Sequence, residues 1–389
     1  MKKHFNLTIG NKLITFSSIA LVIFGSLMIA SAEMGNSVGD TTYLTRVIVK
    51  QAIFAFIGVI SYFAIMNLKL YKVRISFYYI FYIGILFALI ACRAFGATNG
   101  AYAWIWLGSF ATIQPSEFAK VFMIVFGAKL FSKDGTIEKN RNAFFKYGIM
   151  AGIYFLIILI VQSDLGSAVV LAIISYCIMM IPPIKGIKKY QNWMSIAVIF
   201  AILIVFFLLS EPVTNWMKGH SDNYMIGRFL AAADPFLYRY DNGYHVIMSL
   251  VSFANGNIFG LGYGNSIHKY MNFPNPSNDF ILPVIVEELG IIGFFGLVIA
   301  YGLVLVPLMY GSLKTRYTST KIVLLGVFVY FTVHFILNVG GVGALIPLTG
   351  VPLLLISSGG SSLLASMMSL GFAQAEMVRN RYIDEDNSR

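Results

Sequence analysis

Long apolar runs, separated by short polar connections, dominate the pattern of this 389-residue chain. Most runs reach the roughly 20 residues that a helix needs to cross about 30 Å of hydrocarbon, whereas a tilted barrel strand needs about 10. The pattern predicts an all-α polytopic membrane protein with about ten spans, at residues 13–32, 47–66, 76–92, 116–132, 147–162, 166–182, 193–210, 281–310, 322–340 and 359–378.

Lysine and arginine concentrate in alternate connections between these runs. They occur near residues 69–74, 133–146, 185–189 and 314–321, and again at both ends of the chain. Because cytoplasmic loops carry the excess of basic residues, this distribution predicts that both termini are cytoplasmic. The expected location is the cell inner membrane, that is, the cytoplasmic membrane.

The stretch 211–280, between the seventh and eighth expected spans, is too long for a simple connector. It contains aromatic and aliphatic clusters such as residues 247–253, which argue against disorder. We therefore expect a large extracellular loop with short interfacial helices. Nothing marks a second domain, so residues 1–389 are predicted to form a single transmembrane domain.

Composition excludes a soluble domain, because hydrophobic residues make up 58% of the chain, charged residues 12%, and the mean hydropathy is +0.77. The formal net charge of +11 is explained by topology and by contact with anionic lipid, so no nucleic-acid partner is expected. Cys92 and Cys177 both fall in apolar segments, which predicts buried thiols. Neither a disulfide framework nor metal-ligand spacing is present.

Ionisable residues inside a membrane are costly and are therefore candidates for function. Glu117 and Lys120 stand three residues apart at the start of the fourth span, on one helix face, as either a structural ion pair or a functional one. Just before them, Gln114 precedes Ser116, which is a plausible N-cap. Trp104 fits either a membrane-interface residue or a cavity residue.

Four further carboxylates lie at or near helix starts on the side expected to be extracellular. Asp164, in QSDLGSA, either caps the sixth span or faces a site. In FPNPSNDFILPVIVEELG, either Asn278 or Asp279 caps the eighth helix, or Asp279 performs chemistry. Glu287 and Glu288 point about 100° apart around that helix, so at most one faces a cavity squarely, and we expect both to be structural.

The outer segments also contain basic and glycine-rich sequences. Arg228 and Lys269 match phosphate charge, and the glycines of GLGYGNSIHKY let backbone amides approach an anion. The spacing follows no phosphate-loop pattern, which argues against nucleotide hydrolysis. Near the end of the chain, NVGGVGALIPLTGVPLLLISSGGSS is uncharged irregular backbone, which requires protein or a wet cavity beside it at membrane depth. We expect that cavity to open outward.

Together these motifs resemble those of the SEDS family of bacterial shape, division and sporulation proteins, over essentially the whole chain. The resemblance rests on NGAYAWIWLG with QPSEFAK, on QSDLGSA, on GLGYGNSIHKY followed by NDFI and VEELG, and on NVGG, IPLTGVP and SSGGSS, in that order. The string NVGGVGALIPLTG is more similar to division members than to elongation members.

The resemblance implies a ten-helix glycosyltransferase that polymerises lipid II on the outer face of the cytoplasmic membrane. It implies a class B penicillin-binding protein as transpeptidase partner, alongside other divisome or elongasome proteins, and an undecaprenyl-pyrophosphate-linked glycan as product. Asp279 corresponds to the family's catalytic aspartate. The candidate cavity or substrate-binding residues are Glu117, Lys120, Asp164, Arg228, Lys269, Trp104, Gln114, Ser116 and Ser361.

The chemistry can be examined separately from the family. Joining two such sugars needs a base for a hydroxyl and a charge partner for the departing diphosphate, but no strong general acid, because diphosphate leaves well. Asp279 with Arg228, Lys269 or a divalent cation such as Mg²⁺ or Mn²⁺ meets this need, and no other cofactor is expected. Partial burial is expected to raise the pKa of the Asp279 carboxyl toward a useful value.

The chain departs from the family pattern at Ala103, Ser163 and Ser358, and the loop before Asp279 lacks a glutamate and a histidine. These changes affect substrate placement but leave the base. Two alternatives remain: a flippase or transporter of lipid-linked precursors, and a non-catalytic scaffold. A transporter needs polar residues that continue to the cytoplasmic face, yet the intramembrane charges lie toward the outer half, apart from Glu376.

Overall fold

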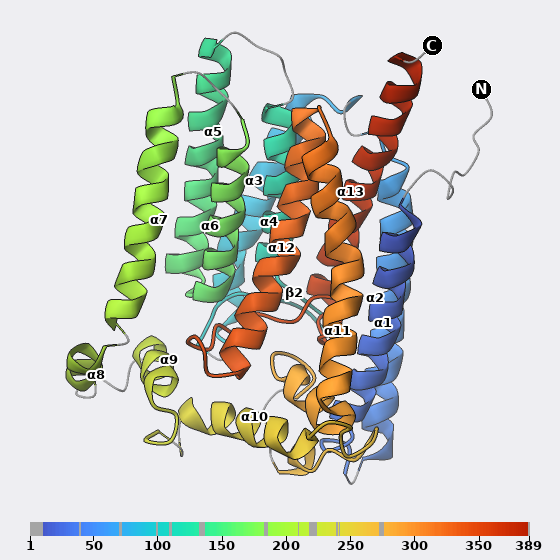
Figure 1. Cartoon of the computed structure of the whole chain (residues 1–389), viewed down its shortest axis with the longest axis vertical. Helices are drawn as coiled ribbons and strands as arrows, with labels where there is room; N and C mark the ends of the chain where they lie inside the picture. The colour runs from blue at the N-terminus through green and yellow to red at the C-terminus, as the bar shows by residue number, and fades with distance from the viewer. Residues whose placement is uncertain are drawn as a thin grey trace.

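The computed structural model describes residues 11–38, 40–69, 72–98, 100–108, 111–131, 137–182, 186–208, 210–217, 224–238, 240, 242–271 and 276–387. Long helices run side by side along one axis, and the start of α1 lies at the same end of the bundle as the end of α13 (Figure 1). The helices that correspond to the expected spans are α1 (Lys12–Ala32), α2 (Thr41–Met66), α3 (Ile75–Ala91), α4 (Pro115–Leu130), α5 (Ile137–Leu156), α6 (Leu165–Met180), α7 (Lys188–Leu208), α11 (Ile281–Lys314), α12 (Thr318–Val342) and α13 (Gly360–Asn387).

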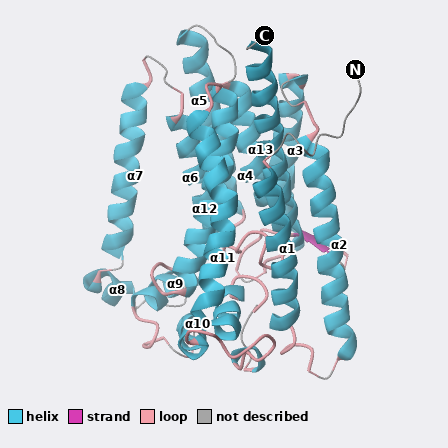
Figure 2. Cartoon of the chain, turned by 45° about the vertical axis from the view of Figure 1, so that its right-hand side comes forward, coloured by secondary structure: helices cyan, strands magenta, loops and turns pink. Residues whose placement is uncertain are grey.

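The prediction of an all-α polytopic membrane protein is confirmed. In the described part of the chain, 7 helices are long and apolar enough to cross a membrane, and α6 is a shorter apolar helix. The α4 and α13 helices lie in the same bundle. Viewed from a second side, the long helices still run parallel to one axis (Figure 2).

Local sequence explains where several helices begin. Asn11 accepts a hydrogen bond from the Leu13 amide at the start of α1, and Asp40 does the same for Thr42 at the start of α2. The predicted N-cap Ser116 is wrong: Gln114 is the N-cap of α4, because Pro115 occupies the first helical position, where its missing N–H costs nothing.

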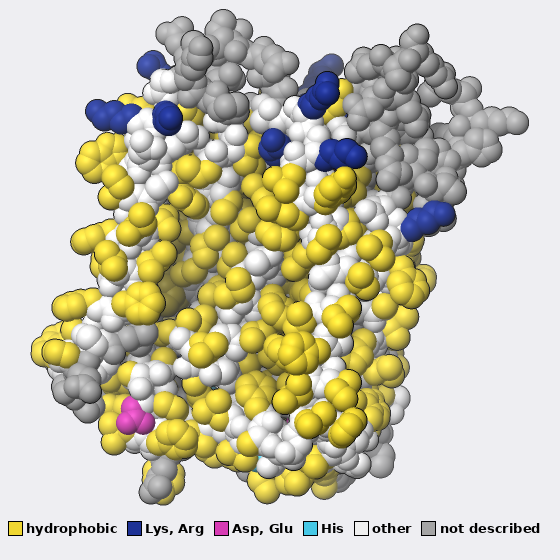
Figure 3. Space-filling view, in the orientation of Figure 1, with side chains coloured by type: hydrophobic (Ala, Val, Ile, Leu, Met, Phe, Trp, Pro, Cys, Tyr) yellow, Lys and Arg dark blue, Asp and Glu magenta, His cyan; other side chains and the backbone are white. Residues whose placement is uncertain are grey.

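The two ends of the bundle differ in chemistry. Lysine and arginine side chains gather at the end that carries the start of α1 and the end of α13, while apolar side chains cover the flanks (Figure 3). At the other end lie the short helices α8 (Glu211–Met217), α9 (Tyr224–Ala233) and α10 (Asn242–Gly256), and α10 runs across the bundle axis (Figure 1). Stretch 211–280 thus contains short helices, and its residues 218–223, 239, 241 and 272–275 lie outside the described residues. That this stretch is extracellular and that its helices are interfacial stay predictions.

Smaller elements lie between the helices along the chain. Strand β1 (Ile105–Leu107) pairs antiparallel with β2 (Ala111–Ile113), with Trp106 opposite Thr112. The 3-10 turns are η2 (Cys92–Phe95) and η5 (His268–Tyr270), and a π-helical turn, η3 (Ile157–Val161), ends α5. Both cysteines are free; Cys92 is buried and Cys177 is partly buried.

The α11 helix is interrupted at Gly290, whose φ of 69° and ψ of −168° are not helical. Residues 257–262 lie directly against this break. The amides of Leu261 and Gly262 donate to the carbonyls of Glu287 and Glu288 at 2.9 Å each. A Cβ on Gly290 would lie 2.3 Å from the Ile258 carbonyl oxygen, so only glycine fits. The break therefore fixes how the first turns of α11 meet the segment that follows α10.

Candidate functional site

One cavity of about 740 Å³ lies at the end of the bundle that carries α8 to α10. All four outer connections predicted from the sequence contribute to it, namely those near residues 93–115, 163–166, 211–280 and 341–358. The end of α1, the first half of α2 and the start of α13 close its sides. Segments far apart in the sequence thus form a single polar site.

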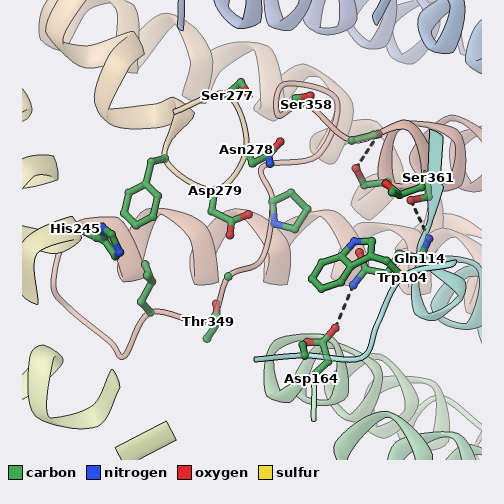
Figure 4. A pocket seen from close by; sticks show the side chains of 18 of the residues that line it. Trp104, Gln114, Asp164, His245, Ser277, Asn278, Asp279, Thr349, Ser358 and Ser361 are labelled. Carbon is green, nitrogen blue, oxygen red and sulfur yellow. Dashed lines mark hydrogen bonds between the residues drawn. The ribbon is translucent and has the colours of Figure 1, made fainter. Parts of the chain in front are cut away.

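Asp279 lies in the turn before α11, partly buried, with its carboxylate directed into this cavity (Figure 4). Its backbone carbonyl accepts a hydrogen bond from Asn338 Nδ2 at 2.9 Å. Among the described residues, no hydrogen-bond donor is assigned to the Asp279 carboxylate itself. The sequence alternative in which Asn278 or Asp279 caps the helix is wrong, because the N-cap is Phe280 and no side-chain cap bond forms.

The turn that carries Asp279 is held from two sides. Ser357 Oγ donates to the Asn278 carbonyl at 2.7 Å, and the Ser358 amide donates to the Ser277 carbonyl at 2.7 Å. The Ser277 hydroxyl donates to the Glu33 carboxylate, which also accepts from Tyr43 Oη at 2.9 Å. Ser277 therefore attaches the turn before α11 to the C-terminal end of α1.

Burial raises the pKa of the Asp279 carboxyl to about 6; the Arg228 guanidinium opposes this shift, and the Asp164 carboxylate adds to it. A Cβ on Gly350 would lie 3.5 Å from both Asp279 Oδ2 and Arg228 Nη2. The base candidate and the cation therefore both lie beside Gly350. Gly350 has a φ of 67°, which side-chain-bearing residues rarely adopt.

The cavity also brings together four other residues singled out from the sequence. Gln114 Nε2 donates to Asp164 Oδ2 at 3.0 Å, and the Gln114 amide donates to Ser361 Oγ at 3.2 Å (Figure 4). Asp164 Oδ1 accepts from the Ser167 amide at 3.0 Å, so Asp164 caps α6 and faces the cavity at once. Trp104 lines the same space.

Glu117 and Lys120 do not line the cavity of the described structure; they form a fully buried ion pair behind it. Lys120 Nζ lies 2.7 Å from Glu117 Oε1, and Tyr330 Oη donates to Glu117 Oε2 at 2.9 Å. His334 Nε2 lies 3.3 Å from Lys120 Nζ. Each charge has polar partners here, which is what burial of an ion pair in a low-dielectric interior requires.

Ser116 and Lys269 also lie outside the cavity lining of the described chain. Ser116 Oγ donates to Ser167 Oγ at 3.4 Å between α4 and α6. Lys269 Nζ lies 2.9 Å from Glu288 Oε1 and donates to the Gly264 carbonyl at 2.7 Å. Lys269 is therefore paired with the buried Glu288 carboxylate and does not face the cavity in which a phosphate would bind.

The two glutamates of α11 are both buried and partnered away from the cavity lining, as expected for structural residues. Glu288 accepts from Ser31 Oγ at 2.6 Å as well as from Lys269. Glu287 Oε1 lies 2.7 Å from His268 Nδ1. These pairs join the end of α1, the segment after α10 and the start of α11.

Comparison with known proteins decides the family. The FtsW, RodA and SpoVE family of cell cycle proteins matches residues 11–380. This chain belongs to that family. The SEDS resemblance is thereby confirmed, together with the multi-pass membrane character.

Relatives cover nearly the whole chain. A Bacillus subtilis (strain 168) protein named probable peptidoglycan glycosyltransferase FtsW is 30% identical over 363 residues, 92% of this chain and 87% of its own. Stage V sporulation protein E of Bacillus subtilis (strain 168) is 31% identical, over 92% of this chain and 94% of its own.

Solved structures share the fold. A chain from a study of polymerization and crosslinking by a peptidoglycan synthase complex has a TM-score of 0.71 at 23% identity, covering 96% of this chain and 99% of its own. The rod shape determining protein RodA of Thermus thermophilus has a TM-score of 0.64 at 22% identity, covering 97% and 99%. At these identities the likeness concerns architecture.

Several cavity residues in this family member were missed by the sequence reasoning. Lys50 lies within the expected second span, where any ionisable residue deserved the same scrutiny as Glu117. Glu33 directly follows the first apolar run, where its position at the helix end is the only sequence signal. His245 of α10 lines the cavity, and its pKa is lowered by burial and by Arg228. No sequence pattern marks His245.

A resident metal site is not supported by the donor set. No group of three or more His, Cys, Asp or Glu side chains that could hold an ion occurs in the part of the chain that the structure describes. The carboxylates that line the cavity are Glu33, Asp164 and Asp279. Glu33 and Asp164 already accept several hydrogen bonds.

Proposed function

We propose that this protein is a peptidoglycan glycosyltransferase that polymerises lipid II into glycan strands at the outer face of the cytoplasmic membrane. The curated relatives that bear the name probable peptidoglycan glycosyltransferase support the activity. Lipid II is the substrate class that the motif resemblance implies. Its sugars and diphosphate lie at the depth of the lipid headgroups. A cavity formed by the outer connections lies at the same depth and is therefore accessible to them.

The observation that carries the proposal is the state of Asp279. Its carboxylate faces a cavity of about 740 Å³, and in the described structure no donor is assigned to it. Its pKa, raised to about 6, suits a base that works near neutral pH, because the group is ionised there yet basic enough to accept a proton.

In the proposed reaction, Asp279 accepts the proton of the 4-hydroxyl of the acceptor sugar as that oxygen attacks the anomeric carbon of the donor. The bond from that carbon to the diphosphate breaks, and undecaprenyl diphosphate leaves with the electron pair. Direct attack inverts an α-linked donor to a β-linked product. Arg228 and Lys50 line the cavity and supply positive charge for the diphosphate.

The proposed partners follow from the family. One structural relative comes from a complex that coordinates polymerization and crosslinking. For this chain we propose a class B penicillin-binding protein as transpeptidase, together with other divisome or elongasome membrane proteins. The function serves cell division or elongation. A divalent cation such as Mg²⁺ or Mn²⁺ would arrive with the substrate diphosphate, because Mg²⁺ commonly binds through substrate phosphates with only one or two protein carboxylates.

The test uses the purified protein with its co-purifying transpeptidase, lipid II as substrate, and the variant Asp279→Asn. We expect glycan polymer from the wild type and none from the variant. Polymer from both removes the catalytic assignment of Asp279. Movement of fluorescent lipid II across vesicles, with no polymer from either protein, favours a transporter. Neither polymer nor movement favours a scaffold.

A further inference from the structure

Asn338 of α12 occupies an unusual position relative to the base. It is 3% exposed, and its side-chain nitrogen donates two hydrogen bonds, each of 2.9 Å, to the backbone carbonyls of Asp279 and Val351. A primary amide has two N–H groups, so both are used. One side chain therefore joins the turn that precedes α11 to the segment that follows α12.

One of these carbonyls belongs to the base itself, and the other belongs to the segment beside which its carboxylate lies. Val351 follows Gly350, the residue at which an added Cβ would be 3.5 Å from both Asp279 Oδ2 and Arg228 Nη2. The distance between the Asp279 backbone and this segment consequently sets where the carboxylate stands relative to Arg228. Asn338 controls that distance through two bonds to one nitrogen atom.

The other anchors of the turn act further from the carboxylate. Ser357 and Ser358 bond the carbonyls of Asn278 and Ser277. Among the described residues, Asn338 is the side chain that bonds Asp279 itself. Because the carboxylate has no assigned donor there, the backbone bond from Asn338 is the nearest restraint on its position.

We propose that Asn338 is a positioning residue, which holds Asp279 against the Gly350–Val351 segment so that the base meets the acceptor hydroxyl in productive geometry. The proposal rests on the proposed function. An amide is suited to this role because its two donors diverge from one rigid group; a serine has one donor, and leucine, though similar in size, has none.

The neighbouring turn of α12 makes a second contact with the same segment. His334, four residues earlier on the same helix face, has its Nδ1 3.2 Å from the Pro352 carbonyl. The Lys120 ammonium can only donate, so the facing His334 Nε2 accepts and Nδ1 carries the hydrogen that binds Pro352. The segment after Gly350 thus keeps a second attachment to α12 when Asn338 is changed.

The test compares Asn338→Leu and Asn338→Ser with a matched control, Gln374→Leu. Gln374 is also a buried amide: its Nε2 donates to the Asn11 carbonyl and to Tyr62 Oη, both at 2.9 Å, and to Thr15 Oγ1 at 3.3 Å, and its Oε1 accepts from the Asn11 amide at 2.8 Å. Gln374 contacts the N-terminal end of α1, and the cavity lies at the opposite end of that helix, at Glu33. Gln374 is therefore far from the cavity. All variants are purified with the transpeptidase partner, and polymerisation of lipid II is measured per mole of monodisperse protein.

We expect both Asn338 variants to lower kcat on the order of 100-fold with little change in KM, because misplacement of a base affects the transition state rather than substrate binding. The acid limb of the pH–rate profile should move to higher pH, because Arg228, which lowers the pKa of Asp279, is no longer held beside it. Gln374→Leu should retain the wild-type kcat and pH profile.

Three outcomes contradict the proposal. The first is wild-type kcat and pH profile in folded Asn338→Leu and Asn338→Ser. The second is an equal loss of kcat in Gln374→Leu, which indicates general destabilisation. The third is that Gln374→Leu is monodisperse but neither Asn338 variant folds, which indicates that the Asn338 amide is needed for the fold. Absence of polymer from the wild type, measured in parallel, instead overturns the proposed function.

Discussion

Asp279 and three buried glutamates of this molecule differ in what surrounds their carboxylates. Glu117, Glu287 and Glu288 are buried, and each has a lysine or histidine within 2.9 Å. Asp279 faces a cavity, and within the described structure its carboxylate has no assigned donor. A carboxylate inside a membrane protein that faces a cavity without a hydrogen-bond donor is a candidate for chemistry. A carboxylate whose charge is fully paired contributes to stability.

Neutralising one carboxylate of each kind tests whether Asp279 and the partnered glutamates have different roles. Asp279→Asn should lower polymerisation by at least about 100-fold, because a general base contributes about 10²- to 10⁴-fold. Its thermal stability should rise at pH 7.5. The pKa of Asp279 is raised from 3.8 to about 6, so the ionised group costs stability, a cost absent below pH 3.8 and complete above pH 6.

Glu287→Gln is the counterpart and should show the opposite behaviour. Lost bonds to His268 and Ser266 should lower thermal stability, while the molecules that remain folded polymerise lipid II at the wild-type rate. Differential scanning fluorimetry and gel analysis of the polymer measure both quantities. If Glu287→Gln is as inactive per folded molecule as Asp279→Asn, the distinction between open and partnered carboxylates fails.

The buried pair on α4 gives the next largest effect, on stability. Glu117→Gln leaves Lys120 buried without its counter-charge, which should cost about 3–5 kcal/mol and lower the yield of monodisperse protein. The double variant Glu117→Gln with Lys120→Met should recover part of that loss, because no unpaired charge is left. Denaturant or thermal unfolding in detergent measures both. Equal stability of the single and double variants contradicts the pairing.

Lys50 allows the comparison to be extended to cations. Lys50→Met should lower kcat/KM for lipid II about 10-fold, because a bond to a charged group is worth about 1.5–3 kcal/mol. Arg46→Met is the control on the same helix. Arg46 forms an exposed ion pair with Asp40 at 3.0 Å, and exposed pairs contribute little. A similar loss in both variants would show that the basic residues act only through bulk charge.

The smallest predicted effect concerns the anchor of the turn. Ser277→Ala removes the hydrogen bond to Glu33, which should cost about 1 kcal/mol of positioning and lower kcat about fivefold. Initial rates at saturating lipid II measure it. An unchanged kcat shows that Ser357, Ser358 and Asn338 suffice to hold the turn.

Much of the fold could be predicted from the sequence because span length is a strong physical constraint. Each expected apolar run coincides with one helix, and each outer connection reaches the cavity. The cap of α4 was misplaced at Ser116, although Pro115 carried the signal that Gln114 is the cap. Asp279 was identified through its motif, since position within a helix start alone does not separate a cap from a base.

The pairing of charges could not be predicted, because it depends on contacts between distant helices. Glu117 meets Tyr330, which is 213 residues away in the chain, and Lys120 meets His334. Lys269 was expected to face phosphate, yet the break of α11 at Gly290 brings Glu288 to it. Helix periodicity gives the face on which a residue lies but does not give the neighbour of that face.

The pH dependence of polymerisation is the most direct test of whether the Asp279 carboxylate is the general base. For the wild type, kcat/KM should rise with pH through a single ionisation near 6, because the base works only when it is deprotonated. The residual rate of Asp279→Asn should lack this limb. A wild-type rate that is flat between about pH 5 and pH 8, or a limb near pH 6 that persists in Asp279→Asn, would contradict the account.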